Sequence, residues 1–327
     1  MSANRTALIL GATGGIGGAV ARRLLAAGWT VKALHRNAAA QQARMPRITW
    51  IQGDAMERAD VVAAARGVAL IVHAVNPPGY RNWGALVLPM IDNSIAAARA
   101  AGARILLPGT VYNYGADAFP FIDVDAGQHP VTRKGAIRVE MERRLELAAA
   151  DGVRSLIVRA GDYFGPDAAN NWFSQGLVTP GAQLATVRNP GTPGIGHQWA
   201  YLPDVAETMV RLVEREPELG TFARFHMDGH WDADGQTMAA TVARVAGARQ
   251  VKPMAWWLMM ALSPFVTTLR EMREMRYLWK TSVRLDNQRL RALLGSEPHT
   301  PLDEAVRATL AGLGCLPKPQ GAALEQA

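Results

Sequence analysis

Apolar runs alternate with helical patterns along the first half of the chain. Six segments predict strands, at 7–10, 30–35, 48–51, 68–75, 104–107 and 155–158, and those at 7–10 and, apart from His73, 68–75 are wholly apolar. Helical patterns separate most of them, at 16–27, 56–65, 83–101 and 131–150. Strands that are separated by helices of this length pair in parallel through right-handed crossovers. The pattern therefore predicts an α/β fold, a Rossmann-type doubly wound parallel sheet with a small C-terminal α/β substrate lobe.

A glycine-rich turn, 11–17, joins the first predicted strand directly to the first predicted helix. Glycine allows a tight turn, a close approach of the backbone to a pyrophosphate, and close packing of the helix against the strand. The free N–H groups at the start of the helix then face the phosphates. Because the turn follows a strand and opens a helix, it has the context of a dinucleotide site. The predicted contacts are Gly11, Thr13, Gly14, Gly15, Ile16 and Gly17.

Ligands of a doubly wound sheet bind beyond the carboxyl ends of its strands. Arg36 follows the second strand, where an arginine accommodates a 2′-phosphate and an acidic residue would hold a ribose hydroxyl. Arg36, helped by Arg44, therefore predicts NADP(H) as the cofactor. His73 lies within an apolar run and is expected to be a core histidine. Further cofactor contacts are predicted after the later strands, at Asp54, Ala55, Ala74, Val75, Asn76, Ala160 and Tyr163.

The second half of the chain is expected to cover the cofactor. We predict an NADP-binding core over 1–166 and a substrate lobe over 167–327, interleaved with the core. The segment 170–175 should face the nicotinamide, and 318–327 reads as a frayed tail. Methionines cluster with Trp256 and Trp257 at helical spacing, which is typical of a core. The same cluster would also suit an apolar or aromatic substrate.

Composition narrows the class of protein. The chain has 327 residues, is 49% hydrophobic and contains one cysteine, Cys315, so no disulfide framework or cysteine metal site is expected. The net charge of +7 is dispersed rather than gathered in runs, which argues against nucleic acid and suits an anionic cofactor. No apolar run reaches the roughly 18 residues of a membrane span. We expect a cytoplasmic monomer or homodimer that acts on a small molecule.

Four segments in order resemble the extended and atypical short-chain dehydrogenase/reductases, which include the NAD-dependent epimerase/dehydratase and NmrA-like groups. They are the glycine turn, Gly53-Asp54, 108–115 and 159–166. The resemblance continues more loosely through 197–206, 287–295 and 300–305, and it implies an NAD(P)-dependent oxidoreductase.

In active members, a Ser or Thr near the end of the fifth strand polarises a carbonyl, and a Tyr-x-x-x-Lys pair on the next helix supplies the proton. Thr110 matches the first position. Lys134 stands at the place of the tyrosine and Arg138 at that of the lysine. These two residues share one helical face, but two cations cannot reproduce the chemistry of a phenol.

Three hypotheses are consistent with Lys134 and Arg138 in place of the Tyr-x-x-x-Lys pair. In one, Lys134 is an acid or base whose pKa is lowered by Arg138 and by burial, as its resemblance to the isoflavone and phenylcoumaran benzylic ether reductases implies. In another, Lys134 holds the nicotinamide ribose, and Tyr112, Tyr114 or Tyr163 donates the proton. In the third, the protein is a catalytically silent NADP(H)-sensing regulator of the NmrA-like type.

A structural role, as solvated helix charges, also remains open for Lys134 and Arg138. The sequence favours hydride transfer to an apolar carbonyl or conjugated substrate, with an NAD(P)-dependent sugar epimerase/dehydratase as an alternative. The candidate catalytic residues are Thr110, Tyr112, Lys134 and Arg138.

Overall fold

A parallel sheet of seven strands forms the centre of the computed structural model, which describes residues 5–77, 82–168 and 171–316. The predicted tail, 318–327, and the first residue of the segment 170–175 lie outside these ranges. The strand order is β11-β7-β5-β4-β1-β2-β3. The strands are β1 Thr6–Leu10, β2 Thr30–His35, β3 Thr49–Gln52, β4 Leu70–His73, β5 Arg104–Gly109, β7 Ser155–Arg159 and β11 Phe222–His226. The predicted Rossmann-type fold is confirmed.

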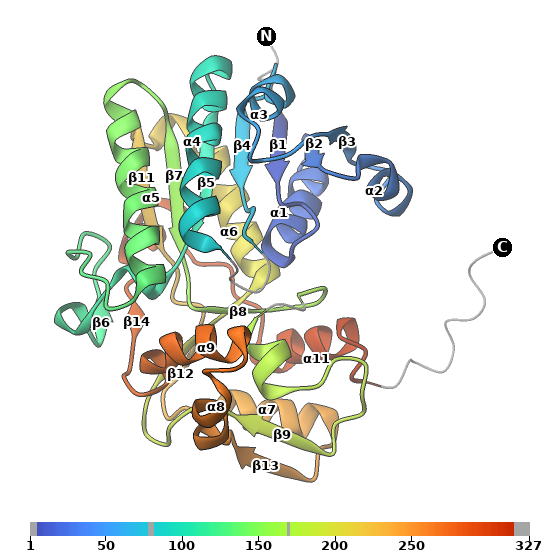
Figure 1. Cartoon of the computed structure of the whole chain (residues 1–327), viewed down its shortest axis with the longest axis vertical. Helices are drawn as coiled ribbons and strands as arrows, with labels where there is room; N and C mark the ends of the chain where they lie inside the picture. The colour runs from blue at the N-terminus through green and yellow to red at the C-terminus, as the bar shows by residue number, and fades with distance from the viewer. Residues whose placement is uncertain (1–4, 78–81, 169–170, 317–327) are drawn as a thin grey trace.

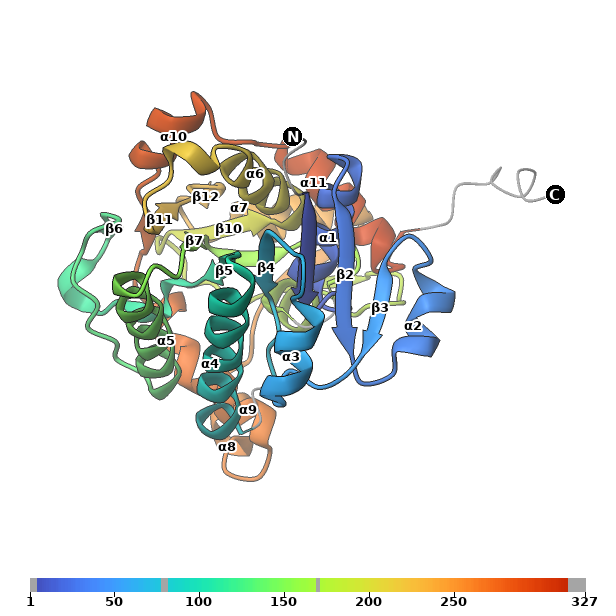
Figure 2. The same cartoon turned by 90° about the horizontal axis from the view of Figure 1, so that it is seen from above.

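Helices cover both faces of this sheet, as Figure 2 shows. On one face, α1 (Gly15–Ala26) and α6 (Leu202–Glu214) pack with the buried side chains of β1 and β2. On the other face, α3 (Arg58–Ala64), α4 (Trp83–Ala101) and α5 (Arg133–Ala150) close a second apolar layer. A short helix, α2 (Ala38–Arg44), flanks β3 at the edge of the sheet.

Local sequence explains where the helices beside the site begin and end. α4 ends at Gly102, whose φ of +66° is the left-handed conformation that glycine adopts without strain. α5 begins after Thr132, whose hydroxyl oxygen accepts the Gly135 N–H at 3.0 Å. The first part of α4, with Trp83, Leu86 and Met90, therefore lines a cavity beyond the carboxyl ends of β4 and β5, whereas the end of α4 leads to the start of β5.

The remaining elements form a lobe on the side of the sheet where its strands end (Figure 1). Its strands are β8 Asp162–Phe164, β9 Thr186–Asn189, β10 His197–Tyr201, β12 His230–Asp232 and β13 Gln250–Pro253. Its helices are α7 Thr237–Ala246, α8 Trp256–Leu262, α9 Thr267–Glu274 and α11 Leu302–Gly312. A separate core rich in aromatic residues, among them Phe164, Trp199 and Trp279, holds the lobe together.

The two halves of the chain are interleaved. β11 lies beside β7 and extends the central sheet, and α6 packs on the same face as α1, although both elements follow residue 166. Two short strands, β6 (Phe121–Ile122) and β14 (Arg284–Leu285), pair beside the core, and α10 (Gln288–Leu294) follows the second of them. Within the described ranges, every helix is too short or too polar to span a lipid bilayer.

Candidate functional site

A cavity of about 640 Å³ opens where the strand order reverses between β1 and β4. Leu10 is paired with His73 across these strands, so the loops that follow them begin side by side. This is the point at which doubly wound sheets bind their ligands. The cavity is lined by these candidates: Gly11, Thr13, Gly14, Gly15, Ile16, Arg36, Asp54, Ala55, Ala74, Val75, Asn76, Thr110, Tyr112, Arg138, Ala160 and Tyr163.

The glycine turn is shaped by close backbone contacts. Gly11 has a φ of +92°, and a Cβ there would lie 2.5 Å from the carbonyl oxygen of Ala74. A Cβ on Gly17 would lie 2.2 Å from the carbonyl oxygen of Gly11. Gly17 is buried and therefore closes the turn, whereas Gly14 and Gly15 line the cavity at the start of α1. This cradle fits the pyrophosphate of a dinucleotide.

Arg36 and Asp54 stand at one end of the cavity. Arg36 is exposed at the end of β2, and its carbonyl oxygen accepts a hydrogen bond from the Gln52 side chain at 2.5 Å. The backbone N–H of Asp54 donates to Asp60 Oδ2 at 2.9 Å, which fixes the loop after β3. Arg44 is exposed in the last turn of α2 and is not among the residues that line the cavity. An anionic group beside Arg36 would meet a cation there.

Thr110 and Arg138 line the same cavity, and α5 starts close to the backbone of Tyr112. Thr110 Oγ1 accepts the N–H of Tyr112 at 2.9 Å, which leaves the hydroxyl hydrogen of Thr110 to donate elsewhere. A Cβ on Gly135 would lie 2.2 Å from the carbonyl oxygen of Tyr112, so only glycine allows α5 to start this close. The guanidinium of Arg138 lies 5.2 Å from the centre of the Trp83 ring, in cation–π contact.

Lys134 lies beside this group but does not line the cavity. It is 2% exposed, and its Nζ donates to Glu274 Oε2 at 2.5 Å. Its backbone N–H also donates to Glu274 Oε1, at 3.2 Å. The sequence indicated Arg138 as the charged neighbour of Lys134, and the structure adds a carboxylate from the end of α9. Lys134 therefore joins the core to the lobe.

The three tyrosines that the sequence offered as proton donors differ in position. Tyr112 and Tyr163 line the cavity, whereas Tyr114 is buried and its hydroxyl lies 3.3 Å from His226 Nε2. Among the described residues, the buried hydroxyl of Tyr163 has no hydrogen-bond partner. Burial raises the pKa of Tyr163 to about 12, although the positive charge of Arg138 opposes the shift. Tyr163 is therefore a protonated donor at neutral pH.

His73 is 2% exposed, as expected of a core histidine, and it also lines the cavity. Its Nδ1 lies 2.8 Å from the hydroxyl of Ser94. Its Nε2 has no partner within the described chain. Burial lowers the pKa of His73 to about 3, and the charge of Arg138 adds to the effect. The imidazole is therefore neutral at physiological pH.

Several residues that line the cavity were not predicted. Trp83, Leu86 and Met90 lie on one face of α4 at spacings of three and four, a pattern that could have revealed them. Asn171 and Trp172 also line the cavity, and they belong to the segment 170–175 that was predicted to lie there. Asp162 bonds to His197 Nε2 at 2.9 Å through its Oδ2. This contact joins β8 to β10 and has no local signal in the sequence.

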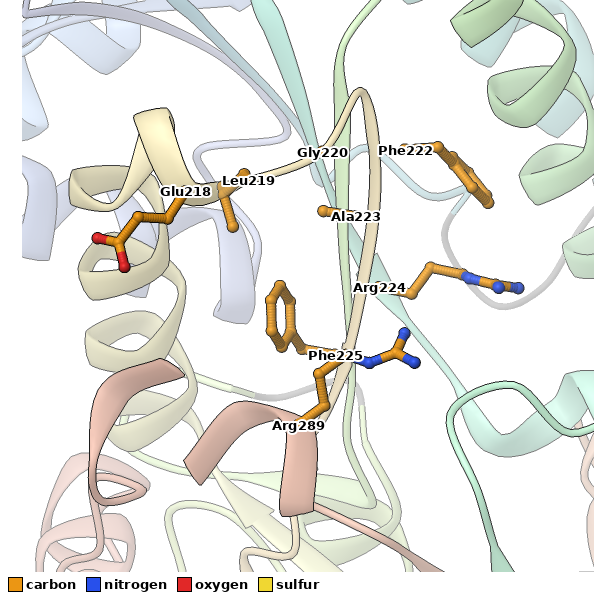
Figure 3. A pocket seen from close by; sticks show the side chains of 8 residues that line it. All are labelled: Glu218, Leu219, Gly220, Phe222, Ala223, Arg224, Phe225 and Arg289. Carbon is orange, nitrogen blue, oxygen red and sulfur yellow. The ribbon is translucent and has the colours of Figure 1, made fainter. Parts of the chain in front are cut away.

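A second, smaller hollow of about 200 Å³ lies beside β11 and η5 (Glu216–Glu218). Figure 3 shows the side chains that line it. It contains none of the predicted site residues, and its two arginines, Arg224 and Arg289, both pair with Asp125. Within 5–77, 82–168 and 171–316, no three His, Cys, Asp or Glu side chains are grouped as metal ligands would be. The cavity at β1 and β4 is therefore the candidate site.

Comparison with known proteins agrees with this location. Residues 11–164 match the family model described as NAD(P)H-binding, so the first half of the chain carries an NAD(P)H-binding domain. A comparison with curated proteins finds no match.

The chain is also similar in fold to many solved structures, among them the following three. MoeE5 in complex with UDP-glucose and NAD has a TM-score of 0.71 and 17% identity, covering 94% of this chain and 98% of that one. UDP-N-acetylglucosamine 4-epimerase from Bacillus cereus has a TM-score of 0.70 and 15% identity, covering 92% and 96%. DesIV, a dTDP-glucose 4,6-dehydratase from Streptomyces venezuelae with NAD bound, has a TM-score of 0.69 and 17% identity, covering 94% and 96%. The likeness shows a common fold, that of the NAD-dependent epimerases and dehydratases.

Proposed function

We propose that the protein is an NADP(H)-dependent reductase of apolar carbonyl or conjugated compounds. The observation that carries the proposal is the cavity at β1 and β4, whose lining includes the glycine turn, Arg36, Thr110 and Tyr163, whose buried hydroxyl has no hydrogen-bond partner among the described residues. A bound NADPH would supply a hydride to an electrophilic carbon of the substrate. The glycine turn would hold its pyrophosphate and Arg36 its 2′-phosphate.

Thr110 and Tyr163 would complete the reaction. The hydroxyl of Thr110 is free to donate to a carbonyl oxygen, because the N–H of Tyr112 already occupies its acceptor side. As the carbon–oxygen double bond is reduced, the oxygen takes up one proton, which Tyr163 supplies. The cation of Arg138 would favour the tyrosinate that remains, since its charge already opposes the rise in the pKa of Tyr163.

The walls of the cavity support an apolar substrate. Trp83, Leu86 and Met90 of α4 and Trp172 line the same cavity as Thr110 and Arg138. Such walls exclude water and favour a flat or aliphatic molecule over a nucleotide sugar. In this proposal Lys134 positions the lobe through Glu274 and touches neither substrate nor cofactor.

An epimerase or dehydratase acting on a nucleotide sugar is the second candidate, favoured by the reference structures that hold such ligands or carry such activities. The place of the usual tyrosine is occupied here by Lys134, whose ammonium is engaged by Glu274. A regulator that senses NADP(H) is the third candidate, and it requires no proton donor.

The test is NADPH oxidation with a panel of aldehydes, ketones, enones and benzylic ethers, with UDP- and dTDP-sugars as a separate arm. We expect turnover with an apolar carbonyl or enone. Tyr163→Phe should lower turnover by about 10²–10⁴-fold with little change in NADPH affinity. Tyr114→Phe makes the same change on a tyrosine that does not line the cavity, and it should leave turnover near the unmodified value.

Other outcomes select the alternatives. Conversion of a nucleotide sugar, without reduction of any carbonyl, would support the epimerase or dehydratase. Tight NADPH binding with no conversion in either arm would support the regulator. Unchanged turnover by Tyr163→Phe would show that Tyr163 does not donate the proton, and Tyr112 would then be the candidate proton donor.

A further inference from the structure

The helix α8 consists only of apolar residues, and none of them is buried. Trp257 is 74% exposed, and Phe265, in the loop that follows α8, is 85% exposed. A helix that is apolar on all sides normally lies inside a protein. Contiguous exposed apolar side chains of this kind mark an interaction surface. We call this surface the apolar tip; it consists of Trp257, Leu258, Leu262, Phe265 and Val266.

The apolar tip stands on a base that is fixed to the protein. Trp256 Nε1 donates to the carbonyl oxygen of Pro190 at 3.0 Å, and the ring of Trp256 lies 6.0 Å from that of Trp172. Ser263 is buried and its hydroxyl donates to the Met260 carbonyl at 2.9 Å. Figure 2 shows α8 and α9 projecting beyond α4 at the edge of the molecule. The exposure therefore belongs to an anchored, projecting element.

Basic residues flank the apolar tip in the sequence on both sides. Residues 249–280 contain six Lys or Arg and two Glu, and one of those two, Glu274, is already paired with Lys134. Lys252, Arg270, Arg273 and Lys280 are exposed. Exposed Trp, Phe and Leu that are flanked by basic side chains match the interface of an anionic lipid bilayer, where aromatic rings enter the headgroup region and cations meet phosphates.

We propose that the apolar tip docks the protein on the surface of an anionic lipid membrane. A second copy of the chain fits less well. A seven-residue helix is only about 10 Å long. A stable protein interface buries about 800 Å² on each partner. The positive charge around the tip would also oppose its pairing with itself.

This surface adjoins the candidate site, because Trp256 at its base contacts Trp172 of the cavity wall. A docked protein would hold the cavity close to lipid-dissolved molecules. That consequence rests on the proposed reductase function, whereas docking itself does not. A binding assay that needs no turnover therefore separates the two.

The experiment is vesicle flotation of the full chain with phosphatidylcholine alone and with phosphatidylcholine mixed with phosphatidylserine. We expect binding to the mixed vesicles, weaker binding to the neutral ones, and loss of binding as salt rises. Trp257→Ser combined with Phe265→Ser should lower the partition coefficient by about tenfold or more. Leu147→Ser, which alters a 57% exposed apolar residue on α5, is the matched control and should bind as the unmodified protein does.

A far-UV circular dichroism spectrum and a thermal unfolding curve for each variant confirm that it is folded. The proposal is overturned if the unmodified protein does not float with the mixed vesicles, or if the double variant floats equally well. It is also overturned if neither protein binds lipid and sedimentation shows a dimer of the unmodified protein that the double variant does not form. The apolar tip would then be the contact between two copies of the chain.

Discussion

Lys134 of α5 and Glu274 of α9 form an ion pair in which Nζ and Oε2 are 2.5 Å apart. Glu274 keeps 24% of its side chain exposed, whereas Lys134 keeps 2%. Glu274 also accepts the backbone N–H of Lys134, so one carboxylate from the lobe binds the first turn of a core helix twice. The residue that stands where a catalytic tyrosine is expected thus connects the two halves of the molecule.

Lys134→Met should therefore act mainly on stability and on substrate binding. We expect a loss of about 2 kcal/mol in the free energy of unfolding, since the variant leaves a half-buried carboxylate without its cation. KM should rise and NADPH affinity should change little. Unfolding by urea measures the first effect, and steady-state kinetics the second.

Glu274→Gln and the double variant complete a mutant cycle. The double variant should lose less free energy of unfolding than the sum of the losses in the two single variants, because each single change already breaks the same ion pair. Additive losses would mean that the two side chains do not act on each other. A fall in turnover of about 10²–10⁴-fold at unchanged stability would instead return Lys134 to the role of acid or base.

Arg36 should set the preference for NADPH over NADH. If its guanidinium binds the 2′-phosphate, NADPH should bind at least about tenfold tighter than NADH, or ~1.4 kcal/mol. Arg36→Asp should narrow or invert that ratio in a fluorescence titration. Arg44→Ala changes an exposed arginine that does not line the cavity, so it should leave the ratio unchanged. Equal affinities of the unmodified protein for NADPH and NADH would show that Arg36 does not bind the 2′-phosphate.

Two glycines of the phosphate turn should respond differently to substitution. Gly14 has a φ of −87°, and the nearest atom to a Cβ there is the Gly11 oxygen at 3.3 Å. Gly14→Val should therefore fold while its side chain blocks the pyrophosphate. Gly17→Ala would place a Cβ 2.2 Å from the same oxygen and should cost about 1–3 kcal/mol of stability.

Thermal unfolding and NADPH titration, applied to both variants, check this contrast. NADPH binding that survives Gly14→Val would mean that the cofactor sits elsewhere in the protein.

Much of the fold could be predicted because its signals are local. β2 and α4 match their predicted limits to the residue: Val31, Ala33 and Leu34 of β2 are buried, and α4 is followed by Gly102 in the left-handed conformation. β11 was missed, because Phe222-Ala-Arg-Phe-His226 carries two basic residues whose partners come from distant segments. α2 was missed because its short alanine-rich sequence has no apolar period.

For the site, too, features with a local signal in the sequence could be predicted, and contacts between distant segments could not. The residues after each strand could be placed at one cavity, because parallel strands bring their carboxyl ends to one edge. The partners Glu274 and His197 could not be predicted, since they reach Lys134 and Asp162 through the packing of the lobe. The face of α4 formed by Trp83, Leu86 and Met90 has a readable spacing, but its sequence does not say which side of the sheet it covers.

His73 should make the protein sensitive to acid. Its pKa is about 3 in the folded protein because the imidazole is buried, whereas an unfolded histidine titrates near 6.5. Between these values the unfolded chain binds a proton that the folded chain does not, so stability falls as the pH falls. The contribution is up to about 1.4 kcal/mol of unfolding free energy per pH unit.

His73→Asn tests this effect. The hydroxyl of Ser94 lies 2.8 Å from Nδ1 of His73, and the amide of an asparagine can still donate to it but cannot take up a proton in this pH range. The free energy of unfolding in urea, measured from pH 7.5 down to about pH 4, should therefore decline less steeply for the variant, with the difference at pH 7.5 as the internal reference. Parallel curves for the two proteins would mean that the imidazole of His73 titrates at the same pH in the folded and the unfolded chain, and they would contradict a pKa lowered by burial.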